Sequence, residues 1–139
     1  MLNEIDNIHK LERQLVFLLN LDNWRLEWTG EGYESYDAKG FDPSGKSCVI
    51  EFKFRSKAYA WKMLEKYKYD KLIEEKTQKK YYAVVDHKGV YIFDLGKITT
   101  TTEFIDCPKT TSFDQGDNTK RQKEVFMLGR ENKWYNYKF

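Results

Sequence analysis

Two carboxylates and a lysine fall at positions where they could bind a metal ion beside a phosphate. The segment from residue 33 to 55 has the sequence YESYDAKGFDPSGKSCVIEFKFR, and its Asp42–Gly45 run (DPSG) predicts a tight turn between two strands. If the three residues after Asp42 form the loop, Asp37 lies directly opposite Glu51. Directly opposed residues in an antiparallel pair have Cβ atoms about 4.5–5.5 Å apart. Two negative charges at that distance are unfavourable unless a cation lies between them.

Lys53 shares a face of the second strand with Glu51, since side chains two positions apart on a strand point the same way. Such a group suits metal-assisted hydrolysis of a phosphodiester. Mg²⁺ takes oxygen ligands and keeps several waters, so one or two carboxylates and a substrate phosphate complete its shell. The metal polarises the phosphate and activates a water, and a nearby lysine orients that water or stabilises the developing charge.

The predicted site depends on the register of the hairpin. With a loop one residue shorter, Asp37 would lie opposite Ile50, and the group of charges would not form. The simpler interpretation of the same residues is an exposed hairpin with an ordinary salt bridge, worth about 0–1 kcal/mol.

Residues 2 to about 20 predict a helix that carries a third carboxylate. Its apolar residues recur at helical spacing and form one stripe: Leu2, Ile5, Ile8, Leu11, Leu15, Leu18 and Leu19. Glu12 falls inside that stripe. Because an isolated buried charge is very costly, Glu12 should pair with a Lys or Arg, lie at the wet margin of the stripe, or belong to a metal site.

The segment from Ser56 to about Gln78 predicts a second long helix, with Ser56 as its N-cap. Lys68 lies on its inner face, and either extends to solvent or reaches toward the charged face of the hairpin. The other residues predicted on that inner face are Ala60, Trp61, Leu64, Tyr67 and Leu72.

Short apolar runs predict further strands at 21–28, 80–85, 90–95, 123–128 and 133–139. Residues 86–89 predict a hairpin turn, and the last two strands should pair around 129–132. The polar stretches 99–102 and 110–118 predict loop or edge strand. These elements predict a mixed α/β (α+β) fold, in which a short mixed sheet is flanked by helices. A chain of 139 residues predicts a single domain over 1–139.

Composition limits the function classes without selecting one. The net charge is only +2, but residues 46–80 carry eleven Lys and Arg against five acids, a local excess of +6 that could attract phosphate. The cysteines and histidines lack the spacing of a zinc site. We see no signal peptide and no run approaching the roughly 18–20 apolar residues of a membrane span, so a cytoplasmic protein without a membrane partner is expected.

The order of residues and elements resembles the PD-(D/E)xK nuclease superfamily. Asp37 is followed, after a turn, by Glu51-Phe52-Lys53, with Glu12 on a preceding helix and a Lys-rich helix after it. The succession ERQLVFLL, YDAKG, IEFKFR and YYAVV is similar to the compact core of archaeal Holliday-junction resolvases and restriction-endonuclease-like enzymes. The resemblance covers about residues 4–95, implies an α-β-β-β-α-β core, and leaves 97–139 as a C-terminal extension. One departure is Tyr36 before Asp37, where the family motif has proline.

The resemblance implies a role for each matching residue. Asp37 and Glu51 would bind Mg²⁺, with Mn²⁺ as a substitute, Lys53 would be the catalytic lysine, and Glu12 would be an outer acidic residue. The substrate would be DNA, cut by an endonuclease that could act as a homodimer. Basic residues would contact the phosphates: Lys39, Arg55, Lys57, Lys62, Lys66 and Lys68.

Three functions therefore follow from the sequence as hypotheses. The first is a metal-dependent nuclease acting on DNA. The second is a non-catalytic module on the same fold that binds nucleic acid or another protein. The third is a small α/β interaction protein whose charges are only solvated.

Overall fold

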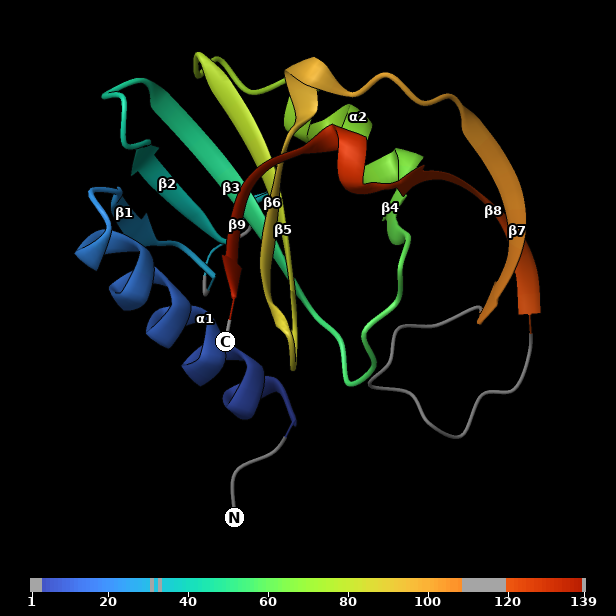
Figure 1. Cartoon of the computed structure of the whole chain (residues 1–139), viewed down its shortest axis with the longest axis horizontal. Helices are drawn as coiled ribbons and strands as arrows, with labels where there is room; N and C mark the ends of the chain where they lie inside the picture. The colour runs from blue at the N-terminus through green and yellow to red at the C-terminus, as the bar shows by residue number, and fades with distance from the viewer. Residues whose placement is uncertain (1–3, 31, 33, 109–119, 139) are drawn as a thin grey trace.

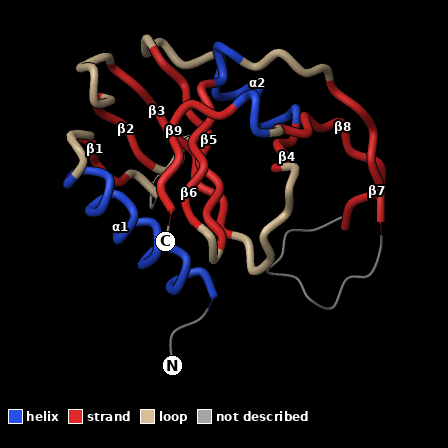
Figure 2. The backbone as a smooth tube through the Cα atoms, viewed as in Figure 1, coloured by secondary structure: helices blue, strands red, loops and turns tan. Residues whose placement is uncertain are grey.

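The computed structural model describes residues 4–30, 32, 34–108 and 120–138 of the chain (Figure 1). Within these residues, six strands form one mixed sheet in the order β1-β2-β3-β5-β6-β9, and three form a second sheet in the order β4-β8-β7. Helix α1 covers one face of the larger sheet, and α2 and the smaller sheet lie on its other side (Figures 1 and 2). The fold is therefore mixed α/β, as predicted.

Helix α1 (Glu4–Leu21) forms where it was predicted, but the face that it buries against the sheet differs from the predicted apolar stripe. Its buried side chains are Glu12, Leu15, Val16 and Leu19, whereas Leu11 and Leu18 are 43% and 53% exposed. The buried positions follow i, i+3, i+4 and i+7, so Glu12 lies on the face that packs against the core. The predicted apolar stripe differs from this buried face by about one residue.

Strands β1 (Arg25–Trp28), β2 (Ala38–Phe41) and β3 (Ser47–Phe54) form an antiparallel meander. The predicted register of the β2–β3 hairpin is confirmed, because Ala38 pairs with Ile50 and Lys39 with Val49. A three-residue loop joins the strands, and Gly45 adopts the left-handed conformation (φ 84°) that such a loop requires.

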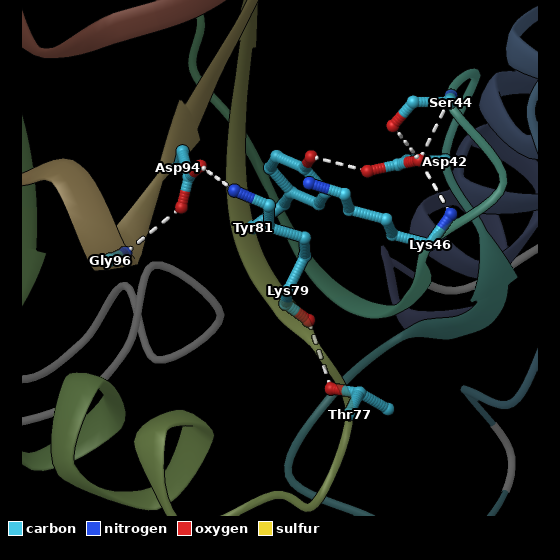
Figure 3. Close-up of polar contacts among 8 residues, drawn as sticks. All are labelled: Asp42, Ser44, Lys46, Thr77, Lys79, Tyr81, Asp94 and Gly96. Carbon is cyan, nitrogen blue, oxygen red and sulfur yellow. Dashed lines mark hydrogen bonds and ion pairs between the residues drawn. The ribbon is translucent and has the colours of Figure 1, made fainter.

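Asp42 holds this turn in place (Figure 3). It is buried, and its carboxylate accepts hydrogen bonds from Ser44, from the Lys46 N–H (3.0 Å) and from the Tyr81 hydroxyl (2.8 Å). Burial opposes ionisation, but these donors outweigh it and lower the pKa of Asp42. Asp42 is therefore satisfied as a structural group, and it sets the register on which the candidate site depends.

The second helix is much shorter than predicted. The predicted first half contains an irregular segment and strand β4 (Lys62–Glu65), and α2 spans only Lys66–Ile73, without a side-chain N-cap. Leu64 and Leu72 are buried as expected, but Trp61 and Tyr67 are exposed. Pairing of β4 with β8, about 60 residues later in the chain, decides this region against a helix.

Strands β5 (Lys79–Asp86) and β6 (Gly89–Asp94) form the predicted hairpin. Strand β5 pairs in parallel with β3, so β4 and α2 form the crossover between them. A 3₁₀ turn (Leu95–Lys97) follows, and Asp94 caps it by accepting from the Gly96 N–H while its other oxygen pairs with Lys79 at 2.9 Å (Figure 3).

The predicted pairing of the last two strands is wrong. Strand β8 (Lys120–Leu128) lies between β4 and β7 (Thr102–Pro108), whereas β9 (Lys133–Lys138) adds to β6 at the edge of the larger sheet. A second 3₁₀ turn (Arg130–Asn132) joins them. The predicted polar stretch 110–118 lies outside the described residues. In the described part of the chain, no helix has the length and apolar character to cross a membrane.

Two hydrophobic clusters lie on opposite faces of the larger sheet. Cys48, Ile50 and Phe52 on β3 pack with α1 and with Trp24 and Tyr81. Residues on the opposite face form the second cluster with α2, β4 and β8: Val49, Leu64, Leu72, Tyr82, Val84, Phe93, Leu95, Phe126 and Leu128. Strand β3 contributes to both clusters, and by alternation Glu51 and Lys53 share the face of Val49, on the side of the second cluster.

Candidate active site

The site begins where β3 loses its neighbour β2. The ladder ends at the Ala38–Ile50 pair, and β3 continues to Phe54 beside β5. The Asp37 N–H still donates to the Ile50 carbonyl (2.9 Å), and Asp37 Oδ2 accepts from the Phe52 N–H at 2.8 Å. The Asp37 carboxylate thus accepts the Phe52 N–H, which would otherwise bond to a backbone carbonyl of a neighbouring strand. This hydrogen bond holds the carboxylate across from Glu51.

Glu12 reaches the same point from α1. It is buried, and its Oε1 accepts a hydrogen bond from Trp28 Nε1 at 3.0 Å. The neighbouring Asp37 carboxyl is close enough to raise the pKa of Glu12. Its partners are therefore an indole and another acid, and the predicted pairing with a Lys or Arg is not found among the described residues.

Trp28 and Gly30 are two residues of this site that the sequence reasoning missed. The guanidinium of Arg13 lies 4.8 Å from the centre of the Trp28 ring, and His9 meets that ring edge-on at 5.3 Å. A Cβ atom on Gly30 would lie 2.6 Å from Trp28 Nε1 and 2.7 Å from Glu12 Oε1. Glycine is therefore needed at position 30 for the Glu12–Trp28 hydrogen bond, but a glycine beside a loop carries no signal of such a role.

The three carboxyl groups hold protons at unusually high pH. Burial and the neighbouring Asp37 raise the pKa of Glu12 to about 7 and that of Glu51 to about 8. Burial also raises the pKa of Asp37, although its hydrogen bonds with Phe52, Glu51 and Glu12 and the charge of Lys68 oppose the shift. A cation placed between the three acids would favour their ionisation at neutral pH.

Lys68 supplies part of that positive charge. Its Nζ lies 3.6 Å from Glu51 Oε1, and its side chain is 40% exposed. Of the two alternatives that the sequence left open, the structure therefore selects the one in which Lys68 reaches toward the hairpin. Because solvent screens it, this pair compensates the three acids only in part.

Lys53 lies on β3 beside Glu51 without a direct partner. Within the described residues, its Nζ takes part in no hydrogen bond or ion pair. Burial, together with the charges of Arg55 and Lys68, lowers the pKa of Lys53 to about 8. A partly buried lysine whose pKa is lowered beside acids is a candidate functional residue.

The predicted phosphate-binding residues are not equivalent. Lys39 and Lys57 are exposed and Arg55 is half-buried, whereas Lys66 pairs with Asp70 at 2.7 Å on α2. Lys62 is buried instead. It pairs with Asp86 at 3.2 Å, donates to the Tyr59 carbonyl, and lies over the Tyr91 ring. Lys62 therefore has a structural role, which removes it from the set of free phosphate ligands.

The donor set fits a hard divalent cation, but it is not a ready-made centre. Among the described residues, no three His, Cys, Asp or Glu side chains are gathered as ligands of one ion. The oxygens of Glu12 and Asp37 are engaged by Trp28 and Phe52 instead. Mg²⁺ needs only one or two carboxylates when waters and a phosphate supply the other ligands, and Asp37 and Glu51 are the pair that would provide them.

Comparisons with known proteins add no relative to this description. No protein-family model matches the chain, and neither the curated proteins nor the solved structures contain a match to it. The chemistry of the site therefore has to be argued from its own geometry.

Proposed function

We propose that this chain is a metal-dependent endonuclease that hydrolyses phosphodiester bonds in DNA on a restriction-endonuclease-like core. One observation carries the proposal. Glu12 from α1, Asp37 from the bend before β2 and Glu51 from β3 converge with raised pKa values, next to Lys53, whose pKa is lowered. Lys53 has no hydrogen bond or ion pair to another described residue. A purely structural ion-pair network would match each acid with a base, and this cluster does not.

The roles follow from the position of each group. Asp37 and Glu51 would hold Mg²⁺ or Mn²⁺, which when bound polarises the scissile phosphate and lowers the pKa of an attacking water. Lys53 would orient that water or stabilise the charge on the phosphate oxygens. The water oxygen bonds to phosphorus, the bond to the leaving sugar oxygen breaks, and that oxygen gains a proton. Glu12 would orient Asp37 and water from the outer side.

DNA would lie across the exposed cations nearest to this point. Lys68 stands on α2 beside Glu51, and Arg55 comes two residues after Lys53, directly after the end of β3. Lys39 and Lys57 are exposed and extend the positive surface. These residues would bind phosphates and therefore hold the backbone without reading the sequence.

The test is cleavage of linear, branched and single-stranded DNA with Mg²⁺ or Mn²⁺. Lys53→Ala and Glu51→Gln should each lower the rate by about 100-fold or more, since each removes a group that stabilises the transition state. Lys76→Ala and Glu74→Gln make the same chemical changes at exposed positions and should leave the rate unchanged. Absence of cleavage of every DNA with either metal would refute the proposal.

A non-catalytic nucleic-acid-binding module is the second candidate. It is favoured by the lack of a three-ligand group within the described residues. Such a module would retard DNA in a gel without metal, with an affinity that falls steeply as salt rises, and would never cut it. An interaction protein with merely solvated charges would do neither.

A further inference from the structure

A basic and aromatic groove of about 590 Å³ lies away from the acids, between the segment that leads into β4 and the outer strands of the larger sheet. Figure 1 shows this segment running from the end of β3 back to β4. Two exposed rings, Tyr59 (55% exposed) and Trp61 (54%), line one side. The rest of the lining comes from residues 88–93, in the β5–β6 turn and β6, and from residues 128–138, for which the sequence suggested no chemistry.

Cations crowd this groove. Lys88, Arg130, Lys133 and Lys138 line it against one acid, Glu131, which leaves an excess of +3 when the internal Lys62–Asp86 pair is set aside. The ammonium groups of Lys62 and Lys133 lie 4.3 Å and 5.4 Å from the centre of the same Tyr91 ring. Burial and the charges of Arg130, Lys138 and Lys62 lower the pKa of Lys133. The mutual repulsion of these cations would be relieved by a bound polyanion.

The Trp61 ring is positioned by packing rather than free to turn away. A Cβ atom on Gly129 would lie 2.5 Å from the ring, so the absence of a side chain at position 129 lets the ring lie against the backbone there. The ring also lines a neighbouring cavity with Tyr59, Arg55 and Lys57. Arg55 directly follows the last residue of β3, two positions after Lys53, so this cavity lies toward the end of the strand that carries Glu51 and Lys53.

We propose that this groove binds a single-stranded segment of nucleic acid, with phosphates on Lys88, Arg130, Lys133 and Lys138 and unstacked bases against Tyr59 and Trp61. A single strand is the occupant that matches both features, because its phosphates need cations and its bases offer faces to aromatic rings. In a duplex those faces are covered by neighbouring bases. An acidic peptide would satisfy the cations but would leave both rings exposed.

The inference rests on the proposed function only in taking nucleic acid as the ligand. Binding in the groove can be measured without cleavage, and so independently of the nuclease activity. The probe is a fluorescein-labelled oligothymidylate of about 16 nucleotides in EDTA, titrated at several salt concentrations. Trp61→Ala should weaken binding by about 5- to 140-fold, the range for loss of one stacked base. The Lys133→Ala/Lys138→Ala double variant should reduce the salt slope by about 1.4, since each lost phosphate contact contributes about 0.7.

Matched controls make the same changes on exposed residues outside the groove. Phe17→Ala removes an aromatic ring from α1, and Lys10→Ala/Lys76→Ala removes two charges. Both should bind like the wild type. Trp61→Phe keeps a ring, so it should retain most of the affinity. The quenching of the protein's tryptophan fluorescence on binding should lose the part that comes from Trp61. This variant separates loss of stacking from misfolding.

Three outcomes would overturn the inference. They are groove variants that bind and respond to salt like the controls, equal binding of a duplex without dependence on Trp61, and equal competition by polyglutamate. The groove and the nuclease fail separately. Groove-dependent binding without cleavage would refute only the nuclease, and cleavage with normal binding by the groove variants would refute only the groove.

Discussion

At the scale of single residues, the acids of the candidate site are held together by groups other than one another. The Phe52 N–H fixes Asp37, the Trp28 indole fixes Glu12, and Lys68 approaches Glu51. None of these contacts neutralises the cluster completely, so the pKa values of Glu12 and Glu51 stay near 7 and 8. In the absence of a cation, the folded protein therefore retains protons that the unfolded chain has lost.

This retention predicts a pH-dependent stability. The ordinary pKa of Glu51 is 4.5, and its value in the folded protein is about 8, so its contribution to stability is complete below pH 4.5 and is lost as the pH rises toward 8. Thermal melting in EDTA should show the melting temperature falling over this range. At pH 8, Glu51→Gln should melt about 3–5 °C above the wild type, equivalent to roughly 1 kcal/mol.

Divalent metal should reverse the same effect. Because binding requires ionised carboxylates, Mg²⁺ should raise the melting temperature of the wild type more at pH 8 than at pH 6, and should release protons on binding. Glu51→Gln should lose this gain, whereas the exposed Glu74→Gln should keep it. A melting temperature that does not change with pH between 5 and 8 would contradict the assigned environment of Glu51.

At the scale of elements, the turn at 42–46 does most to position the site. Four donor groups meet the Asp42 carboxylate, one of them the Tyr81 hydroxyl on β5. The turn therefore anchors the β2–β3 hairpin to the strand beside it. Since a slip of one residue would send Asp37 to the other face, the geometry of this turn is a condition for the acidic cluster.

Replacement of Asp42 should test that link. Asp42→Ala leaves the Tyr81 hydroxyl and the turn N–H groups without their acceptor, and should cost about 3 kcal/mol in urea unfolding. Ser44→Ala removes only one exposed donor and should cost about 1 kcal/mol or less. Because the pKa of Asp42 is lowered from 3.8, its stabilisation is present above that pH and lost as the pH falls further. An equal cost for both variants would show that the turn does not depend on the carboxylate.

At the scale of the whole molecule, β3 is shared by two hydrophobic clusters, and the site lies where elements from both meet. Helix α1 brings Glu12 from the first cluster, and α2 brings Lys68 from the second. Strand β4 connects the larger sheet to β8, with Leu64 buried between them. The smaller sheet therefore helps to position α2, and the C-terminal extension contributes to the core.

Leu64→Ala should therefore destabilise the molecule as a whole. Loss of this buried side chain should cost about 2–5 kcal/mol, whereas Leu18→Ala, at a position that is 53% exposed, should cost about 0.5 kcal/mol or less. We expect circular dichroism and tryptophan fluorescence to report the same single cooperative unfolding transition. Separate transitions from the two probes would show that the smaller sheet unfolds independently, against the prediction of a single domain.

The sequence by itself determined the features that depend on short stretches of chain. The DPSG turn set the register of β2 and β3, alternation placed Glu51 and Lys53 on one face, and helical spacing placed Glu12 among buried residues. Each depends on backbone conformations within a few residues, which turn chemistry and periodicity report directly.

Only the tertiary structure decided the features that depend on distant pairing. Residues 62–65 form a strand because β8 lies beside them, β9 joins β6 instead of β8, and Lys62 is buried because Asp86 and Tyr91 surround it. Local propensity is weak compared with the burial that such contacts provide, so neighbours far along the chain override it. The same reason explains the groove, because the three segments that line it, 58–62, 88–93 and 128–138, meet only in the folded molecule.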